Sequence, residues 1–214
     1  MQKDLHDSRK SYEKDALLES NLSQDPFKTF EQWFRDAENS PGVEEANAMI
    51  VSTISKDGFP KSRVVLLKEI EEGSFLFYTN YTSEKAEAID SHPKIGVHFF
   101  WPALERQIMM KCHVERVGRE KSLAYFNSRP RGSQLGAWAS DQSETIISRE
   151  ALEAQLAAVE KRFENQEVPI PEFWGGYKCT PVCFEFWQGR PNRLHDRILY
   201  TQEEDAWSFK RLQP

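Results

Sequence analysis

Apolar side chains recur at spacings of three and four residues in several segments, which predicts helices. The first helix is expected from Pro26 to about Asn39, because Asp25 can cap it and proline suits its first turn. Apolar residues at 152, 156, 159 and 163 indicate another helix over 148–164, capped by Ser148. Ser83 is expected to cap a short helix over 84–90. Two more helices, 119–128 and 130–138, are predicted on either side of a proline break.

Runs rich in β-branched and aromatic residues, separated by turn residues, predict strands in hairpin order. These runs are residues 48–54, 63–68, 74–79, 94–101, 105–117, 178–187, 193–201 and 207–212. Strands in this order, with helices between them, favour an antiparallel barrel over a doubly wound parallel sheet. The predicted fold class is mainly β with inserted helices (α+β), in a domain over residues 25–214. Residues 1–24 are polar and predict a mobile arm or a helix that orders on contact.

The composition fits a folded protein without a membrane span. Of the 214 residues, 39% are hydrophobic and 29% are charged, which provides enough apolar bulk for a core. The longest nearly apolar run, Ile95 to Leu104, is interrupted by His98 and Pro102 and is shorter than the roughly 18 to 20 residues that a span needs. The charged N-terminus lacks the apolar segment of a secretory signal. We therefore expect a soluble, cytoplasmic protein with no membrane partner.

Charge and cysteine content narrow the range of partners. Residues 1–45 hold 6 Lys+Arg and 11 Asp+Glu, and the rest of the chain holds 22 and 23, so the body is nearly neutral. Because it has no basic stripe, nucleic acid is not an expected partner. Cys179 and Cys183 flank Pro181 in an extended segment, which holds them beyond disulfide reach. With Cys112 they are expected to be reduced thiols, and no metal site is expected.

Three groups of polar residues are candidates for binding anions. Arg193, His195 and Arg197 alternate along a predicted strand and would share one face, where an anion would offset their repulsion. Arg63 and Lys68 are five residues apart, so in a regular strand they would point to opposite faces and could not easily serve one anion. The third group surrounds a helix break and consists of Tyr125, Arg129 and Ser133.

Each group also has an ordinary explanation when it is taken alone: a solvated edge strand, charges that bracket a buried strand, or a helix end. A fourth feature is the helix start at Ser83-Glu84-Lys85, because helix N-termini bind phosphates. Together, in a neutral domain, these features indicate two phosphorylated small molecules. The chain has no G-x-S-x-G, Walker A or G-x-G-x-x-G motif. We therefore expect a bound organic cofactor to supply the chemistry.

Several longer motifs make the sequence recognisable. They run in order from Arg9-Lys-Ser-Tyr12 through RVVLLK (63–68), FYTN (77–80), ERQ (105–107), YFNSRPRGSQLGAW (125–138), FWGGY (173–177) and NRLHDR (192–197) to the final RLQP. With these motifs the chain closely resembles the pyridoxine (pyridoxamine) 5'-phosphate oxidase family of flavin enzymes. The resemblance implies a split β-barrel homodimer with FMN at the subunit interface, each site drawing on both chains. It also implies oxidation of pyridoxine 5'-phosphate and pyridoxamine 5'-phosphate to pyridoxal 5'-phosphate, with O2 as the electron acceptor and H2O2 as a product.

The resemblance also implies residue roles. Arg193 and His195 would lie over the pyridine ring at the reacting carbon, as catalytic residues. FMN would be held by Arg63, Val64, Val65, Leu66, Leu67, Lys68, Tyr78, Thr79, Ser83, Lys85, Gln107, Gln142, Ser143, Trp187 and Arg197. The substrate would be contacted by Arg9, Lys10, Tyr12, Lys68, Tyr125, Arg129, Ser133, Arg193 and His195. The N-terminal R-x-x-Y element is implied to fold over the site.

One position departs from the family's pattern. Glu84 stands where the family commonly has arginine, so an anion replaces a cation near the expected FMN phosphate. We expect Glu84 to point away from that phosphate and FMN to bind somewhat more weakly. Two alternatives remain on the same fold: a non-catalytic binder of FMN or pyridoxal phosphate, and another flavin oxidoreductase of the split-barrel group. Neither would require the whole set of substrate residues named above.

Overall fold

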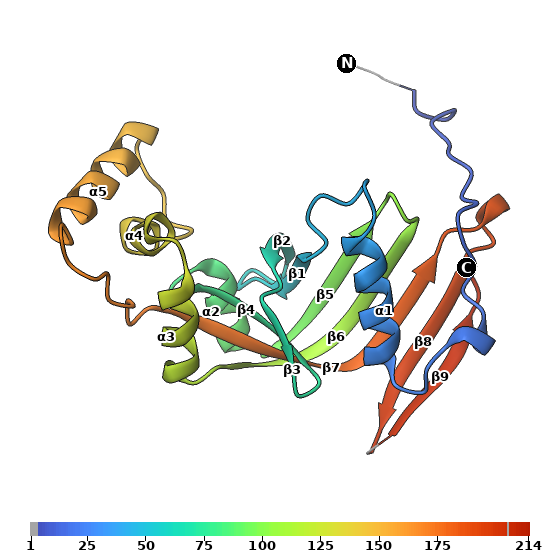
Figure 1. The fold of residues 1–214 in the computed structure, drawn as a ribbon. Coiled ribbons are helices and arrows are strands. Elements are labelled where there is room, and N and C mark those ends of the chain that lie inside the picture. The colour runs from blue at the N-terminus through green and yellow to red at the C-terminus, as the bar shows by residue number, and fades with distance from the viewer. Residues whose placement is uncertain (1–3, 205) are drawn as a thin grey trace. The chain divides into compact units, whose positions relative to one another are not determined.

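The computed structural model describes residues 4–204 and 206–214, so residues 1–3 of the predicted arm lie outside the described residues. Its α-helices are α1 (Pro26–Glu38), α2 (Glu84–Ser91), α3 (Arg119–Ser128), α4 (Arg131–Ala139) and α5 (Arg149–Arg162), and two short 3-10 helices are η1 (Glu19–Asn21) and η2 (Pro191–Arg193). Its strands are β1 (Ala48–Ile54), β2 (Pro60–Leu66), β3 (Glu69–Glu71), β4 (Ser74–Asn80), β5 (Lys94–Trp101), β6 (Arg106–Arg116), β7 (Trp174–Gln188), β8 (Asp196–Glu203) and β9 (Ala206–Leu212) (Figure 1). None of the helices in this described part is long and apolar enough to cross a membrane.

The strands are hydrogen-bonded in the order β2-β1-β5-β6-β7-β4-β3, and β8 pairs with both β7 and β9. Strand β4 is antiparallel to β3 and β7, and β8 is antiparallel to β7 and β9. In this register Tyr78 lies opposite Gly176, and Trp187 lies opposite Arg197. The mainly β fold class with inserted helices is therefore confirmed.

Local capping explains where the helices begin. The Asp25 carboxylate accepts the N–H of Phe27 at 2.9 Å, and the Ser148 hydroxyl accepts the N–H of Ala151 at 3.2 Å, as predicted. Ser83 precedes α2, but its hydroxyl donates to the carbonyl oxygen of Asn80 instead of accepting from the helix. The predicted side-chain cap at Ser83 is therefore wrong.

Two strand predictions need correction. Strand β8 begins only at Asp196, because Asn192 and Arg193 adopt left-handed backbone angles, with φ of 57° and 63°, and form η2. Arg193, His195 and Arg197 therefore do not alternate along one strand. Strand β2 ends at Leu66, so Lys68 lies beyond it. The short strand β3 that follows was not predicted, because its three residues, Glu-Ile-Glu, are too few to show an alternating pattern.

Strand β7 begins at Trp174, four residues earlier than predicted, because Gly175 and Gly176 belong to the strand. A Cβ atom at Gly175 would lie 2.3 Å from the Tyr81 hydroxyl, and one at Gly176 would lie 2.7 Å from the Tyr78 ring. The two glycines thus give room for tyrosine rings and do not mark a turn.

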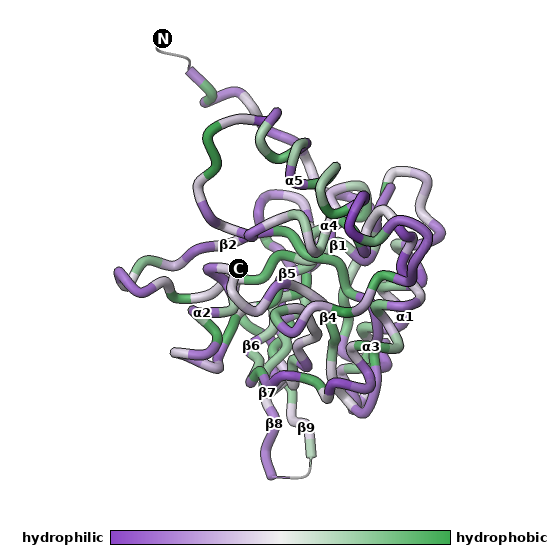
Figure 2. Tube along the Cα trace, turned by 90° about the vertical axis from the view of Figure 1, so that its left-hand side faces the viewer, coloured by the Kyte–Doolittle hydropathy of each residue, from purple (hydrophilic) through white to green (hydrophobic). Residues whose placement is uncertain are grey.

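The chain divides into two compact units. Unit 1 comprises residues 1–50, 96–111 and 181–214, and unit 2 comprises residues 51–95 and 112–180. In unit 1, Phe30 and Trp33 of α1 pack on Phe99 and Phe186, with ring centroids 5.3 and 5.2 Å apart. Hydrophobic residues concentrate along the strands, whereas the described N-terminal segment is mostly hydrophilic (Figure 2).

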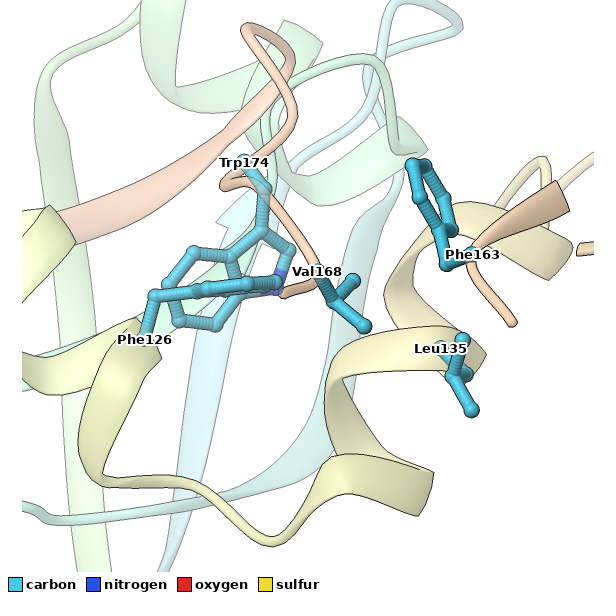
Figure 3. Packing of buried hydrophobic residues seen from close by; sticks show 5 residues of the cluster. All are labelled: Phe126, Leu135, Phe163, Val168 and Trp174. Atoms are coloured by element: carbon cyan, nitrogen blue, oxygen red, sulfur yellow. The ribbon is translucent and has the colours of Figure 1, made fainter. Parts of the chain in front are cut away.

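A second core in unit 2 holds α3, α4 and the segment after α5 against the start of β7. Its buried members are Phe126, Leu135, Phe163, Val168 and Trp174 (Figure 3). The Phe126 ring meets Trp174 edge-on, with 5.2 Å between centroids. This packing fixes the helix break near Pro130 and the indole of Trp174.

Candidate active site

Unit 2 contains a pocket of 620 Å³, lined from β2, β4, α2, α3, α4 and the start of β7. The predicted site residues that it brings together are Val64, Val65, Leu66, Lys68, Tyr78, Thr79, Lys85, Tyr125, Arg129, Ser133 and Gln142. Asn80, Ser140 and Trp174 also line the pocket, although no role was predicted for them. Asn80 belongs to the FYTN motif and Trp174 to the FWGGY motif, so these motifs could have identified both as site residues.

Lys85 is a buried cation in the unit 2 pocket. Its side chain lies on α2, the residue is 8% exposed, and its Nζ lies 3.1 Å from Thr79 Oγ1 and 3.0 Å from Gln142 Oε1. No carboxylate pairs with it among the described residues. Burial, together with the charge of Arg63, lowers the pKa of Lys85 to about 8, although the charge of Glu84 opposes the shift.

Arg63 on β2 adds positive charge near Lys85. Its Nη1 donates to the carbonyl oxygen of Val51 at 3.1 Å and to Thr53 Oγ1 at 2.8 Å, which fixes the guanidinium. Burial lowers the pKa of Arg63, and Glu84 partly offsets this. An anion placed near these two cations would relieve both their repulsion and their desolvation.

Arg129 is a second cation of this pocket, half-buried at the break between α3 and α4. Its Nη1 is buried and has no hydrogen-bond partner among the described residues. The guanidinium lies 4.7 Å from the centroid of the Trp174 ring, and burial lowers the pKa of Arg129, partly offset by Tyr125. A buried donor without an acceptor is costly unless a ligand supplies the acceptor.

Two tyrosines stack beside Arg129. The rings of Tyr78 and Tyr125 lie 4.0 Å apart, and Trp174 stacks behind them. Burial raises the pKa of Tyr78 to about 12, and it raises the pKa of Tyr125 as well. Both phenols therefore keep their protons at neutral pH and can donate hydrogen bonds.

The segment after α4 closes the other side of the pocket. Gln142 Oε1 accepts from both Thr79 Oγ1, at 2.9 Å, and Lys85 Nζ. Ser143 has a left-handed φ of 82°, and its Oγ accepts the N–H of Glu84 at 3.2 Å. Ser143 thus supplies the side-chain acceptor at the start of α2 that Ser83 does not.

Unit 1 contains a separate cleft of 740 Å³. The predicted site residues that line it are Arg9, Lys10, Tyr12, Trp187, Arg193 and His195, and it also includes Ser8, Ser11, Arg190 and Asn192. The rings of Trp187 and His195 lie 4.7 Å apart, and Tyr12 lies 5.8 Å from each. The cleft thus joins the N-terminal segment to the residues around η2.

A backbone contact orients His195. The N–H of Arg190 donates to His195 Nδ1 at 3.1 Å, so the neutral imidazole carries its proton on Nε2. Burial lowers the pKa of His195, the charge of Arg193 lowers it further, and Asp196 opposes this. At neutral pH His195 is therefore mainly an uncharged hydrogen-bond donor.

Comparison with known families gives this geometry a context. A family model described as "Pyridoxamine 5'-phosphate oxidase" matches residues 36–163, and one described as "Pyridoxine 5'-phosphate oxidase C-terminal dimerisation region" matches residues 174–214. The chain belongs to the pyridoxamine 5'-phosphate oxidase family. The resemblance inferred from the sequence motifs is thereby confirmed.

Relatives in this family match over the full length. A protein of Christiangramia forsetii named pyridoxine/pyridoxamine 5'-phosphate oxidase is 53% identical over 214 residues, covering 100% of both chains. A protein of Rubrobacter xylanophilus with the same name is 49% identical, covering 99% of this chain and 97% of its own.

Solved structures agree on the fold. PhzG from Burkholderia lata, in complex with tetrahydrophenazine-1-carboxylic acid, matches with a TM-score of 0.85 and 25% identity, covering 94% of this chain and 98% of its own. A pyridoxamine 5'-phosphate oxidase-related FMN-binding protein from Nostoc punctiforme matches with a TM-score of 0.70 and 16% identity, covering 90% of this chain and 100% of its own. The split β-barrel of the oxidase family is therefore confirmed as the fold.

Several residues expected from the family pattern line neither cavity. They are Arg63, Leu67, Ser83, Gln107, Ser143 and Arg197. Arg197 Nε donates to Glu185 Oε1 at 2.8 Å, and its Nη1 donates to the carbonyl oxygen of Gln213. Gln107 Oε1 lies 3.2 Å from His98 Nε2. Leu67 is buried, with 5% of its surface exposed. Within the described residues no cluster of three or more potential metal ligands occurs.

Proposed function

We propose that this chain oxidises pyridoxine 5'-phosphate and pyridoxamine 5'-phosphate to pyridoxal 5'-phosphate, with FMN as cofactor and O2 as electron acceptor. Full-length relatives at about half identity are named pyridoxine/pyridoxamine 5'-phosphate oxidase. The observation that carries the proposal is the pair of desolvated cations in the unit 2 pocket, Lys85 and Arg129, neither of which has a carboxylate partner among the described residues. The reaction needs two phosphate sites, one for FMN and one for the substrate.

Lys85 is our candidate for the FMN phosphate. Its ammonium is buried, and its neighbours Thr79 and Gln142 are polar and uncharged, so a phosphate would be its principal counter-charge. Arg63 adds long-range attraction. When bound, FMN would accept a hydride from the substrate carbon and pass the electrons to O2, giving H2O2.

Arg129 is our candidate for the substrate phosphate. Its free Nη1 can donate to a phosphate oxygen, and Lys68, Tyr125 and Ser133 line the same pocket. Because the tyrosines stay protonated, they add donors without adding negative charge. This end of the pocket would fix the substrate by its phosphate and leave the ring to be oriented separately.

The unit 1 cleft supplies the candidates for the ring. We assign Arg193 and His195 to orient the pyridine ring and to stabilise charge at the reacting carbon. His195 offers an Nε2–H donor because the Arg190 N–H occupies Nδ1. Arg193 is held at a left-handed φ of 63°, a conformation that costs energy for a non-glycine residue and recurs at functional sites.

Two further features belong to the same proposal. We infer that the enzyme is a homodimer, because residues 174–214 match a dimerisation region, and that its FMN sites lie at the subunit interface. We also infer that the N-terminal arm covers the active site, since Arg9, Lys10 and Tyr12 line the cleft that contains Arg193 and His195.

The decisive experiment is anaerobic. Pyridoxine 5'-phosphate or pyridoxamine 5'-phosphate is added to the purified flavin-loaded protein without oxygen, flavin absorbance is followed, and air is then admitted. We expect bleaching with both substrates, recovery in air and formation of H2O2. A flavin that stays oxidised with both substrates would overturn the proposal and favour a non-catalytic binder or another flavin enzyme.

A further inference from the structure

Glu105 is a buried carboxylate that the function proposed above does not use. It lies in the turn between β5 and β6 and is 2% exposed. Its backbone adopts a left-handed φ of 55°, which costs energy for a residue with a side chain. It lines neither the unit 2 pocket nor the unit 1 cleft. Burying a carboxylate in such a turn requires compensating contacts.

Among the described residues, the hydrogen bonds and the ion pair of the Glu105 carboxylate go to the N-terminal segment. Its Oε2 accepts the backbone N–H groups of Glu13, at 2.9 Å, and Lys14, at 3.1 Å. Its Oε1 pairs with Lys10 Nζ at 3.0 Å. Burial alone would raise the pKa of Glu105, but Lys10 and the two backbone donors outweigh it and lower the pKa below its usual value. The carboxylate therefore holds residues 10–14 as an anion.

These contacts bracket Tyr12. The tyrosine lies between Lys10 and Glu13 in the chain, and its ring contacts Trp187 and His195. Because the Glu105 carboxylate accepts from residues on both sides of it, the backbone of Tyr12 has little freedom to move away from these two rings.

Gly189 completes the same arrangement. Its N–H donates to the carbonyl oxygen of Glu105 at 2.8 Å. A Cβ at this position would lie 2.8 Å from Tyr12 Cβ and 3.1 Å from Glu105 Cβ. Tyr12, Glu105 and the segment that leads to His195 therefore meet in one closely packed contact.

The chain downstream is held independently. Arg106, the next residue, binds Asp15 at 2.6 Å and Asp36 at 2.7 Å. Leu17 N–H donates to Asp196 at 3.1 Å. Lys14 Nζ also donates to the carbonyl oxygen of Ala103 at 2.5 Å. Loss of the Glu105 carboxylate would thus free the Lys10 ammonium and the Glu13 and Lys14 amides without releasing the rest of the N-terminal segment.

We infer that Glu105 is a positioning residue, whose carboxylate clasps residues 10–14 and sets Tyr12 beside Trp187 and His195. The inference rests on the proposed function, because the gain lies in closing the cleft over a bound substrate ring. Glu105 touches no reacting atom. Its loss should therefore weaken substrate capture more than it slows the chemical step.

Hydrogen exchange tests the clasp without any turnover. In the FMN-loaded protein, exchange in a peptide spanning residues 11–17 is compared among wild type, Glu105→Ala, Glu105→Gln and the control Glu115→Gln, which alters an exposed carboxylate on β6. We expect about tenfold faster exchange of the Glu13 and Lys14 amides in Glu105→Ala, and a smaller increase in Glu105→Gln, whose amide oxygen still accepts. Peptides from β8 and the control should match wild type. Wild-type protection of residues 11–17 in Glu105→Gln and Glu105→Ala would overturn the clasp.

Steady-state kinetics test whether the clasp acts through Tyr12. Glu105→Gln should raise KM for pyridoxine 5'-phosphate by roughly tenfold and change kcat much less. In a Tyr12→Ala background the same substitution should add little. A KM penalty that persists in full in that background, or faster arm exchange with an unchanged KM, would overturn the positioning role. If the anaerobic experiment fails instead, the exchange result still decides the clasp, so the two failures are distinguishable.

Discussion

The cations of the unit 2 pocket and two arginines of unit 1 differ in whether a carboxylate pairs with them. In unit 1, Arg106 pairs with Asp15 and Asp36, and Arg197 pairs with Glu185. In unit 2, Lys85 has only uncharged oxygens as hydrogen-bond partners, and Nη1 of Arg129 has no partner among the described residues. A desolvated charge without a counter-charge is unfavourable in the free protein. It becomes favourable once an anion arrives.

The contrast shows that pairing, more than positive charge, distinguishes a ligand-binding cation from a structural one. Arg193 of unit 1 also has no ion pair within the described ranges 4–204 and 206–214, but it is exposed, so its charge stays solvated in the cleft that it lines. The paired arginines hold segments of the protein together, as Arg211 does by bonding Glu19 and the carbonyl oxygen of Leu17. Substituting a ligand-binding cation should therefore affect ligand binding and turnover, whereas substituting a structural cation should affect stability.

The largest effect is expected from Arg193→Ala. Loss of a group that orients the substrate ring should lower the rate of anaerobic flavin reduction by roughly a hundredfold. The dissociation constant of FMN should stay near that of wild type. Stopped-flow absorbance measures the rate, with the exposed Arg149→Ala as control. Turnover within a few-fold of wild type would refute the role of Arg193.

Arg129→Met should come next. Removing the phosphate donor should raise KM for pyridoxine 5'-phosphate by about 10- to 100-fold, whereas the rate measured with unphosphorylated pyridoxine at high concentration should stay unchanged. Since the substitution also removes an unpaired buried donor, the ligand-free protein should melt at the same temperature as wild type or higher. Steady-state kinetics with each substrate measure the first two effects, and thermal melting of the ligand-free protein measures the third. Equal losses with both substrates would contradict a phosphate role.

The sequence predicted what local chemistry determines. Asp25 and Ser148 cap their helices through neighbouring N–H groups, so their roles are visible in the sequence. The left-handed turn at Asn192 and Arg193 was missed because no glycine marks it. In the candidate site, the motifs RVVLLK, FYTN and YFNSRPRGSQLGAW identified most of the pocket residues, because each carries several of them. The contact of Glu105 with Glu13 joins residues 92 positions apart, and no local pattern encodes such a pair.

The low pKa of Lys85 leads to a pH dependence. In the free protein the ammonium loses its proton as the pH rises through about 8, whereas a bound phosphate would hold the proton and raise this pKa. FMN binding therefore takes up a proton above pH 8, and its dissociation constant should rise by up to about tenfold per pH unit there. Fluorescence titration between pH 7 and 10 measures it. In Lys85→Arg the curve should be flat, since arginine stays charged; a flat wild-type curve would remove Lys85 from the FMN site.

The smallest effect is expected at Glu84. Its carboxylate pairs with Lys61 and its N–H donates to Ser143, so the charge is partly compensated, yet it still acts on Arg63 and Lys85. Replacing it by arginine changes the local charge by two, near the phosphate that Lys85 is proposed to hold. We expect Glu84→Arg to lower the dissociation constant of FMN by about a few-fold, while Glu87→Arg, one turn further along α2, changes it less. An unchanged constant in Glu84→Arg would show that Glu84 does not weaken FMN binding.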